Sequence, residues 1–256
     1  MIDIHCHILP GIDDGARSFD EAVALGELLI KEGVSTVVAT PHVFHLRYAT
    51  PTSEQMLSRL TWLNEAFAGR LRVVCGAEVC AVPEALSVLR RPELLINGGP
   101  YMLVEFPSEI VPHGAENLLF ELIASGVRPI IAHPERNRVL VNDPERLRTF
   151  VHMGCYAQLT APYLLANNSA RRLALRWIES GLIHFVASDS HRSDWRAPRL
   201  AAPYQVVERE CGAAVAHALF VANPQAVIRG ETLPFAPELR VFNKTKSSWW
   251  RSLWGG

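Results

Sequence analysis

Short apolar runs rich in β-branched residues alternate along this chain with longer stretches in which apolar residues recur at helical spacing. Seven such runs can be counted, at residues 2–5, 35–40, 72–78, 101–106, 128–133, 155–159 and 183–188. This alternation is typical of βα units that share a parallel sheet. It predicts an α/β fold in which helices fill the gaps between the strands.

Helix boundaries are indicated by residues that cap or end helices. Ser18 and Glu21 have the spacing of a capping box, and the apolar residues after them predict a helix between the first two runs. A cap residue before a proline predicts two further helix starts, at Thr50–Pro51 and Asp143–Pro144. Three glycines are expected where helices stop, at Gly33, Gly126 and Gly181.

The composition is that of a globular protein with enough length for one large core. The 256 residues are 49% hydrophobic and 20% charged, and length alone allows one α/β barrel or two smaller domains. No repeat, low-complexity stretch or linker interrupts the pattern before about residue 235. We therefore expect a single domain over residues 1–235, followed by a basic, Trp-rich tail over residues 236–256.

Charge and cysteine content narrow the class of protein. A net charge of -1 and a pI near 6.8 give no support for nucleic-acid binding through a basic surface. Five cysteines without C-x-x-C spacing indicate neither a disulfide framework nor a zinc ribbon, and they favour a reducing, cytoplasmic compartment. No segment has the pattern of a signal peptide or a membrane span, so the body of the protein is expected to be soluble.

Nine imidazole and carboxylate residues fall at or just beyond the ends of the predicted strands. His5 and His7 share one face of an extended strand, while Cys6 points to the other. In a closed βα barrel the carboxyl ends of all strands meet at one mouth. This donor set contains no thiolate and suits divalent ions such as Mn²⁺, Fe²⁺ or Zn²⁺. Its members are His5, His7, Asp14, His42, Glu78, Glu105, His133, Asp189 and His191.

Each of these residues also has an ordinary structural explanation. A lone H-x-H is a weak signal, because buried histidines are often satisfied by a backbone carbonyl. Glu78 and Glu105 close apolar runs, where a carboxylate is either a ligand or one half of an ion pair with arginine. The joint placement of all nine at one end of the strands favours a metal centre. The remaining histidines fit less well, and of these His45 and His113 are expected at the rim.

Six motifs together resemble the polymerase and histidinol phosphatase (PHP) superfamily. They are H-C-H-I-L-P-G-I-D-D-G at 5–15, T-P-H at 40–42, G-A-E at 76–78, V-E-F at 104–106, A-H-P-E-R at 132–136 and A-S-D-S-H at 187–191. Within the superfamily they most resemble the bacterial capsule and exopolysaccharide tyrosine phosphatases. The resemblance implies a distorted (β/α)7 barrel with three divalent metal ions, usually manganese. It also implies hydrolysis of phosphotyrosine on the C-terminal tail of a membrane-associated tyrosine autokinase that controls polysaccharide export.

The resemblance assigns roles to particular residues. All nine donors match metal-ligand positions, and Glu78 and Glu105 would be the bridging groups. Arg136 matches a phosphate-binding arginine, and Arg196 matches a second, with Arg138 as a competing neighbour. The ordinary alternative for such loop arginines is a surface salt bridge. Their nearness to the ligand positions favours phosphate binding.

The charge balance agrees with an anionic substrate. Three divalent ions would carry +6 against four carboxylates, and two arginines add to this positive charge. The expected mechanism is in-line attack on phosphorus by a metal-bridging hydroxide, with the arginines offsetting charge on the phosphoryl oxygens. A cysteine-dependent phosphatase is excluded, since no cysteine has an arginine six residues after it as the C-x5-R loop requires.

Two other functions and two interpretations of the tail stay open. One alternative is a phosphoesterase of the same superfamily acting on histidinol phosphate or a nucleotide, and another is a regulatory module that keeps the metal site. The tail carries Lys244, Lys246, Arg251 and three tryptophans after residue 248. It would either contact a membrane interface or a partner helix, or form a loose terminus.

Overall fold

Nine parallel strands form the wall of a barrel in the computed structural model, which describes residues 1–239 except the side chain of Arg90. One sheet has the order β1-β2-β4 and the other β3-β5-β6-β7-β8-β9, and a bridge from Cys6 to Ser190 brings β1 beside the end of β9. The strands are β1 (Ile2–Cys6), β2 (Thr36–Ala39), β3 (His42–Val43), β4 (Arg72–Cys75), β5 (Glu78–Cys80), β6 (Tyr101–Glu105), β7 (Arg128–Ala132), β8 (Tyr156–Thr160) and β9 (Phe185–Ala187).

The difference between seven predicted runs and nine strands comes from two breaks. The run at 35–40 corresponds to β2, and β3 is a further short strand that follows Pro41, just beyond that run. The run at 72–78 is divided into β4 and β5 around Gly76. A Cβ atom on Gly76 would lie 2.5 Å from Val38 Cγ1, so the neighbouring strand leaves room only for glycine. The wall of the barrel is therefore irregular between β2 and β3 and between β4 and β5. The predicted α/β barrel is confirmed.

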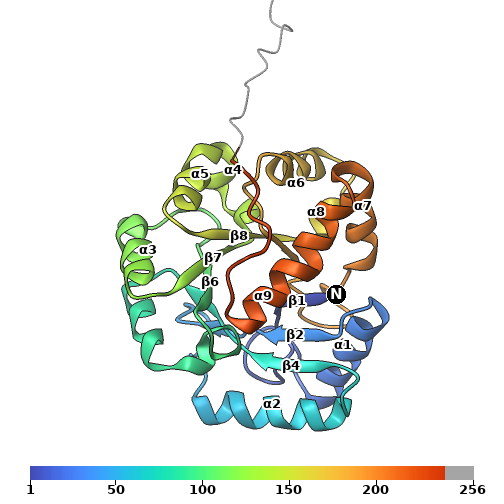
Figure 1. Cartoon of the computed structure of the whole chain (residues 1–256). Helices are drawn as coiled ribbons and strands as arrows, with labels where there is room; N and C mark the ends of the chain where they lie inside the picture. The colour runs from blue at the N-terminus through green and yellow to red at the C-terminus, as the bar shows by residue number, and fades with distance from the viewer. Residues whose placement is uncertain (240–256) are drawn as a thin grey trace, which may run out of the picture.

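Helices surround the strands on the outside, as Figure 1 shows. The α-helices are α1 (Phe19–Lys31), α2 (Ser53–Phe67), α3 (Ala115–Ala124), α4 (Arg138–Asn142), α5 (Pro144–His152), α6 (Ser169–Glu179), α7 (Ala201–Cys211), α8 (Ala213–His217) and α9 (Asn223–Arg229). Short 3₁₀ segments are η1 (Pro83–Arg90), η2 (Pro92–Leu94), η3 (Ile96–Gly98), η4 (Pro134–Arg136) and η5 (Ala161–Leu165), and η6 (Ala218–Ala222) is a π-helical turn.

Most of the predicted helix ends are correct. Ser18 caps α1 by accepting a hydrogen bond from the Glu21 N–H at 3.2 Å, although the Glu21 carboxylate turns to Arg17 instead of completing the box. Asp143 precedes α5 as predicted. Gly33, Gly126 and Gly181 follow α1, α3 and α6 with positive φ.

The predicted helix start at Thr50–Pro51 is wrong by two residues. Helix α2 begins at Ser53 and is capped by Thr52, whose hydroxyl accepts a hydrogen bond from the Gln55 N–H. The Gln55 side chain accepts in turn from the Thr52 N–H at 2.9 Å, which completes a capping box. Thr50 instead accepts from the Phe44 N–H and so stabilises the preceding loop.

Two hydrophobic clusters lie on the two sides of the strands. Side chains that alternate along β6, such as Met102 and Val104, pack outward against the helices, while Leu103 belongs to the cluster inside the barrel. Val227 and Ile228 of α9 belong to the inner cluster as well, and α9 crosses the barrel in Figure 1. Helix α9 therefore closes the amino end of the barrel.

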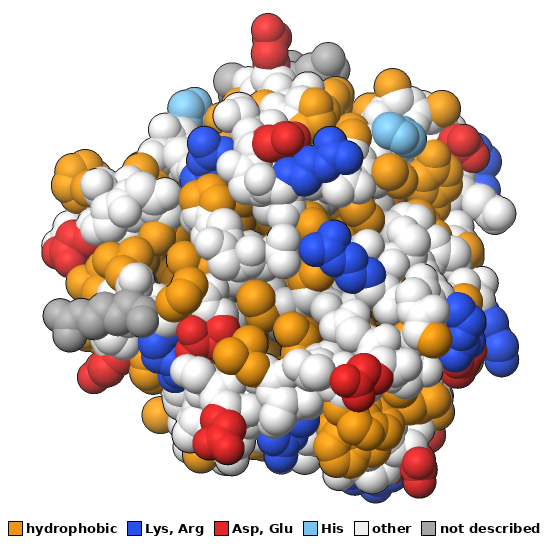
Figure 2. Space-filling view, turned by 60° about the horizontal axis from the view of Figure 1, so that its bottom comes forward, with side chains coloured by type: hydrophobic (Ala, Val, Ile, Leu, Met, Phe, Trp, Pro, Cys, Tyr) orange, Lys and Arg blue, Asp and Glu red, His pale blue; other side chains and the backbone are white. Residues whose placement is uncertain are grey.

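The surface is mixed in charge. Basic and acidic side chains are interspersed over the face shown in Figure 2, in agreement with the net charge of -1. Within residues 1–239, no helix combines the length and apolarity needed to cross a bilayer. The predicted tail, 236–256, lies outside the described residues from position 240 onward.

Candidate metal centre

The carboxyl ends of the strands surround a cavity of about 190 Å³. Seven of the nine predicted donors line it, and His5 and His7 lie fully buried beside them, each with Nε2 3.4 Å from Glu78 Oε2. His5 lies in β1, His42 and Glu78 begin β3 and β5, and Glu105 ends β6. The other donors lie in segments that follow strands. The structure thus brings all nine predicted donor residues to one site.

A β-bulge turns the first two histidines into this site. Asp3 pairs with Val37 and Cys6 with Ala39, so three steps along β1 match two steps along β2. The extra residue reverses the alternation of side chains, because each inserted residue shifts the facing of those that follow. Ile2 and Ile4 therefore point into the barrel interior, and His5 and His7 point to the same side above them.

Four groups of side chains have donor atoms within 4.8 Å of one another. Neighbouring groups share His5, His7 or His42, so that cations held by them would lie side by side. The groups are His7-Asp14-His42-His191, His5-His7-Asp189, His5-Glu78-His133 and His42-His45-Glu105.

Three of the imidazoles have their Nδ1 atom held by an acceptor. His5 Nδ1 lies 2.9 Å from Gln158 Oε1, His7 Nδ1 lies 2.8 Å from Asp13 Oδ2, and His191 Nδ1 lies 3.1 Å from the Asp189 carbonyl oxygen. Each acceptor requires a proton on Nδ1, which leaves the Nε2 lone pair directed into the cluster. This arrangement is typical of histidines that bind metal ions.

Several donor atoms have no satisfactory partner among the described residues. The Nε2 atoms of His5 and His7 lie only 3.3 Å apart, and Asp14 Oδ1 and His42 Nδ1 are buried without a hydrogen bond from the described residues. Buried polar atoms are normally paired, because an unpaired one loses its interaction with water. A set of divalent cations would satisfy these atoms, so the residues fit a metal cluster.

The pKa values show strong electrostatic coupling. Burial opposes ionisation of Glu78, but the imidazoles of His5, His133 and His42 outweigh it and hold the pKa of Glu78 well below its ordinary value. Burial likewise favours neutral His42, yet Glu78 and the bonds to Asp14 and Glu105 raise its pKa to about 10. The site therefore keeps its carboxylates ionised and holds positive charge close to them.

Strained backbone positions several of these side chains. His133, Asp189 and Arg196 all have positive φ, at 30°, 51° and 55°. In β7 the inward-facing residues are Ile130 and Ala132, so continued alternation would turn His133 away from the cavity. The left-handed turn directs its ring inward, where Nε2 lies 2.6 Å from Glu78 Oε1. Such strain is characteristic of functional sites.

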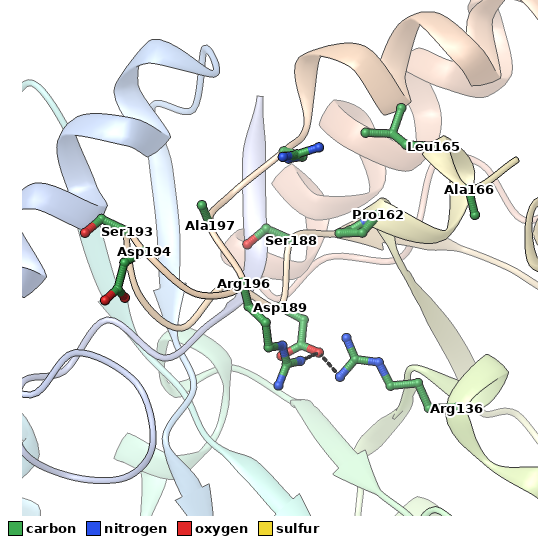
Figure 3. A pocket seen from close by; sticks show the side chains of 11 residues that line it. Arg136, Pro162, Leu165, Ala166, Ser188, Asp189, Ser193, Asp194, Arg196 and Ala197 are labelled. Atoms are coloured by element: carbon green, nitrogen blue, oxygen red, sulfur yellow. Dashed lines mark hydrogen bonds and ion pairs between the residues drawn. The ribbon is translucent and has the colours of Figure 1, made fainter.

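Two arginines converge at one edge of the cavity. Arg136 Nη1 lies 2.5 Å from Asp189 Oδ2, and Arg196 also contacts that oxygen while its Nη1 lies 2.9 Å from His191 Nε2. Figure 3 shows both guanidinium groups directed at Asp189. Arg138, the competing neighbour, is exposed and pairs with Glu109 at 3.3 Å, so it does not line the cavity.

The structure adds residues that sequence reasoning did not assign. Asp13 stands next to the predicted ligand Asp14 in the D-D-G motif, but its buried carboxylate orients His7 and accepts from the His42 N–H. Gln158 carries no signal beyond its place in a predicted strand. His45 lines the cavity as a half-buried residue, in agreement with the expected rim contact, and its ring stacks on His42 with centroids 4.6 Å apart.

The other histidines lie elsewhere. His113 is exposed and is not among the lining residues, so its expected rim contact with the cavity is absent from the described part of the chain. His152 and His217 are exposed on α5 and α8. His184 is buried near the amino end of the barrel, where its Nδ1 accepts a hydrogen bond from the Ala157 N–H at 3.2 Å.

A distorted βα barrel with this donor set at its carboxyl end defines a barrel of the PHP class. More narrowly, the chain belongs to the family described as capsular polysaccharide synthesis, CpsB/CapC, whose model matches residues 1–229.

Curated relatives agree with this assignment. The chain is 34% identical to the tyrosine-protein phosphatase YwqE of Bacillus subtilis, over 91% of this chain and 93% of that protein. It is 30% identical to the tyrosine-protein phosphatase CpsB of Streptococcus agalactiae, over 90% of this chain and 98% of that protein.

Solved structures agree as well. A structure from a study of YwqE and of CpsB from Streptococcus pneumoniae, described as unique metal-dependent tyrosine phosphatases, superposes with a TM-score of 0.86 at 33% identity. That superposition covers 94% of this chain and all of the solved one. A β-aspartyl dipeptidase with a TM-score of 0.57 and 18% identity shares the fold alone.

Proposed function

We propose that the protein is a metal-dependent tyrosine phosphatase that hydrolyses phosphotyrosine on the tail of a membrane-associated tyrosine autokinase. The observation that carries the proposal is the convergence of Arg136 and Arg196 at the edge of the donor cluster. A phosphoryl group bound there would meet both guanidinium groups and the cations together. The names of the relatives support tyrosine phosphatase activity, and the family description supports a role in capsule or exopolysaccharide synthesis.

The nine donors would hold three divalent ions, with manganese as the favoured metal. Three of the four donor groups consist only of residues predicted as ligands. Glu78 has an imidazole near each of its carboxylate oxygens, so it would be placed to contact two of the ions. When bound, such ions supply a water of lowered pKa and polarise the phosphoryl oxygens. Histidine and carboxylate donors without thiolate suit Mn²⁺, and Fe²⁺, Co²⁺ and Zn²⁺ are the alternatives that metal analysis would distinguish.

The chain's own side chains bind and orient the substrate. Arg136 is mostly buried, and although burial disfavours its charge, the Asp189 carboxylate keeps its pKa above the ordinary value. Its charge is therefore permanent, and its planar fork matches two phosphoryl oxygens. Arg196 would offset negative charge on the phosphoryl oxygens from the opposite side of Asp189 (Figure 3). The phenol of tyrosine has a pKa of roughly 10, so its departure requires no dedicated proton donor.

A thiolate nucleophile is incompatible with the structure. None of the five cysteines lines the cavity, and burial raises the pKa of Cys80 and Cys211 to about 11 and that of Cys155 to about 12. Cys6 is fully buried, and its pKa is raised further still. All five are free thiols, which supports the cytoplasmic location that we propose for the enzyme.

Phosphate release from a phosphotyrosyl peptide tests the proposal. We expect the metal-loaded protein to release phosphate, EDTA to abolish release, added Mn²⁺ to restore it, and iodoacetamide to leave it unchanged. Histidinol phosphate and nucleoside monophosphates serve as competing substrates in the same assay. Faster turnover of these small molecules would overturn the assignment to phosphotyrosine. Loss of activity on alkylation but not on chelation would overturn the metal-dependent mechanism.

A further inference from the structure

A second cavity of about 610 Å³ opens directly beside the metal cavity. The two cavities share Arg136, Asp189 and Arg196, which lie together at one edge in Figure 3. On one side the larger cavity is walled by η5 and the residue after it, with Pro162, Leu165 and Ala166; the opposite wall comes from the loop after β9. A phosphoryl group held by the arginines would therefore have the rest of its molecule facing this larger space.

A third cavity, of about 300 Å³, continues from the second. Ala166 lines both, and beyond it the third cavity is bordered by Asn167, Asn168 and the first turns of α6. Shared lining residues thus connect three cavities in series. Taken as a cube, the second cavity is about 8.5 Å across, which is the span of two or three extended residues at roughly 3.3 Å each. The second cavity therefore has room for two or three residues of an extended peptide.

Free positive charge lies along this series. Arg199 lines the second cavity and Arg172 the third; both are exposed, and neither forms an ion pair with any residue between 1 and 239. Arg171 differs, because it pairs with Glu210 at 2.9 Å. The carboxylate of Asp194 at the wall is already shared between Arg17 and Arg192. The groove therefore offers two unneutralised guanidinium groups beyond those that would bind phosphate.

We propose that these cavities form a docking groove for an acidic peptide segment next to the phosphotyrosine. A carboxylate two or three residues from the phosphotyrosine would pair with Arg199, and a more distant one with Arg172. Pro162 and Leu165 would contact the aliphatic parts of the peptide. This inference rests on the proposed phosphotyrosine phosphatase activity and names the sequence context that the enzyme prefers.

Three phosphotyrosyl peptides test the groove, identical except for Glu, Gln or Lys at the three positions on each side of the phosphotyrosine. Exposed ion pairs contribute modestly, so each arginine is expected to change kcat/KM by roughly 2–5-fold, and both together by about 10-fold, mainly through KM. The wild type should prefer the Glu peptide, less so at high salt. The R172Q/R199Q double variant should lose the preference, and R199E should shift it toward the Lys peptide.

Controls separate this inference from the proposed function. Arg229 of α9 is also exposed and has no ion pair within the described chain, so R229Q should keep the wild-type preference. Hydrolysis of p-nitrophenyl phosphate, which has no flanking residues, should be unchanged in every variant. If no phosphotyrosyl peptide is hydrolysed, the proposed function fails. If the peptides are hydrolysed at equal kcat/KM, or if the preference survives in the double variant, the groove alone fails.

Discussion

The two ends of the barrel bury polar groups in opposite ways. At the amino end, α9 and apolar side chains such as Leu103 and Ile130 close the interior, and His184 receives its hydrogen bond from the chain itself. At the carboxyl end, the same strands carry histidines and carboxylates whose donor atoms crowd within 4.8 Å of one another. Burial of a polar residue is therefore not what marks a functional site. The crowding of many imidazole and carboxylate atoms, some of them without a hydrogen bond from the described residues, is the distinguishing feature.

Strand β6 carries both environments on one face. Tyr101 and Leu103 are fully buried in the inner cluster, and Glu105, two residues further, lines the metal cavity. The side-chain period of two places all three on the inner side. Two residues along this strand therefore separate a core side chain from a side chain of the metal cavity.

The largest expected effect comes from replacing, one at a time, two buried carboxylates: Glu78 inside the metal cavity and Glu135 outside it. Glu78→Gln removes a charge that contacts four imidazoles, and we expect bound metal and phosphatase activity to fall by on the order of 10³-fold. Glu135→Gln is the matched control: this residue is equally buried, but its Oε1 accepts from the Thr160 N–H outside the metal cavity. Elemental analysis should show full metal in E135Q. Equal loss from both variants would remove the distinction.

A second test uses the shared face of β6. Leu103→Ala leaves a cavity in the barrel interior and should lower the free energy of unfolding by about 3 kcal/mol, with metal content unchanged. Glu105→Ala removes a partly exposed carboxylate and should lower the metal content. It should change the stability of the metal-free protein little, because partly exposed ion pairs contribute little. Urea denaturation of chelator-treated protein, paired with metal analysis, measures both. If L103A lost metal but kept wild-type stability, the separation between the apolar interior and the metal cavity would be contradicted.

The third test concerns a residue that holds a ligand without being one. Asp13→Asn keeps the size of the side chain but removes the charge that fixes the His7 ring, so we expect metal affinity to fall about 10–100-fold. Asp20→Asn, an exposed position in the first turn of α1, is the control. Metal titration followed by restored activity gives the affinity. If D13N binds metal as tightly as D20N, Asp13 has only a structural role in the loop.

Much of the barrel was predictable because strands and helices alternate in hydrophobic pattern, and the nine donors were predictable because motif and strand end coincide. The breaks at Pro41 and Gly76 were not, since the second depends on the close approach of Val38 from another strand. The facing of His5 depends on a β-bulge, and the facing of His133 on a left-handed turn. The D-D-G motif likewise does not show which aspartate faces His7. These features depend on backbone geometry that side-chain periodicity does not encode.

The smallest expected effect belongs to the buried histidine at the amino end. Burial lowers the pKa of His184 to about 4, below its ordinary 6.5. The unfolded chain therefore takes up a proton between these pH values that the folded chain does not, so the stability contribution is complete above pH 6.5 and is lost as the pH falls toward 4. Between pH 7 and pH 5.5 this amounts to about 1 kcal/mol.

His184→Asn keeps an acceptor for the Ala157 N–H and removes the titrating ring, so its stability should fall less than that of the wild type over this pH interval. The substitution also removes the contact of the ring with Tyr156, which lowers the free energy of unfolding equally at every pH. This loss cancels when the stability of each variant at pH 5.5 is subtracted from its stability at pH 7. All other titratable groups are the same in both proteins, so their contribution cancels in the comparison. His217→Asn, on the exposed face of α8, should behave as the wild type. An unchanged pH dependence in H184N would mean that folding leaves the pKa of His184 at its ordinary value, which would contradict the prediction.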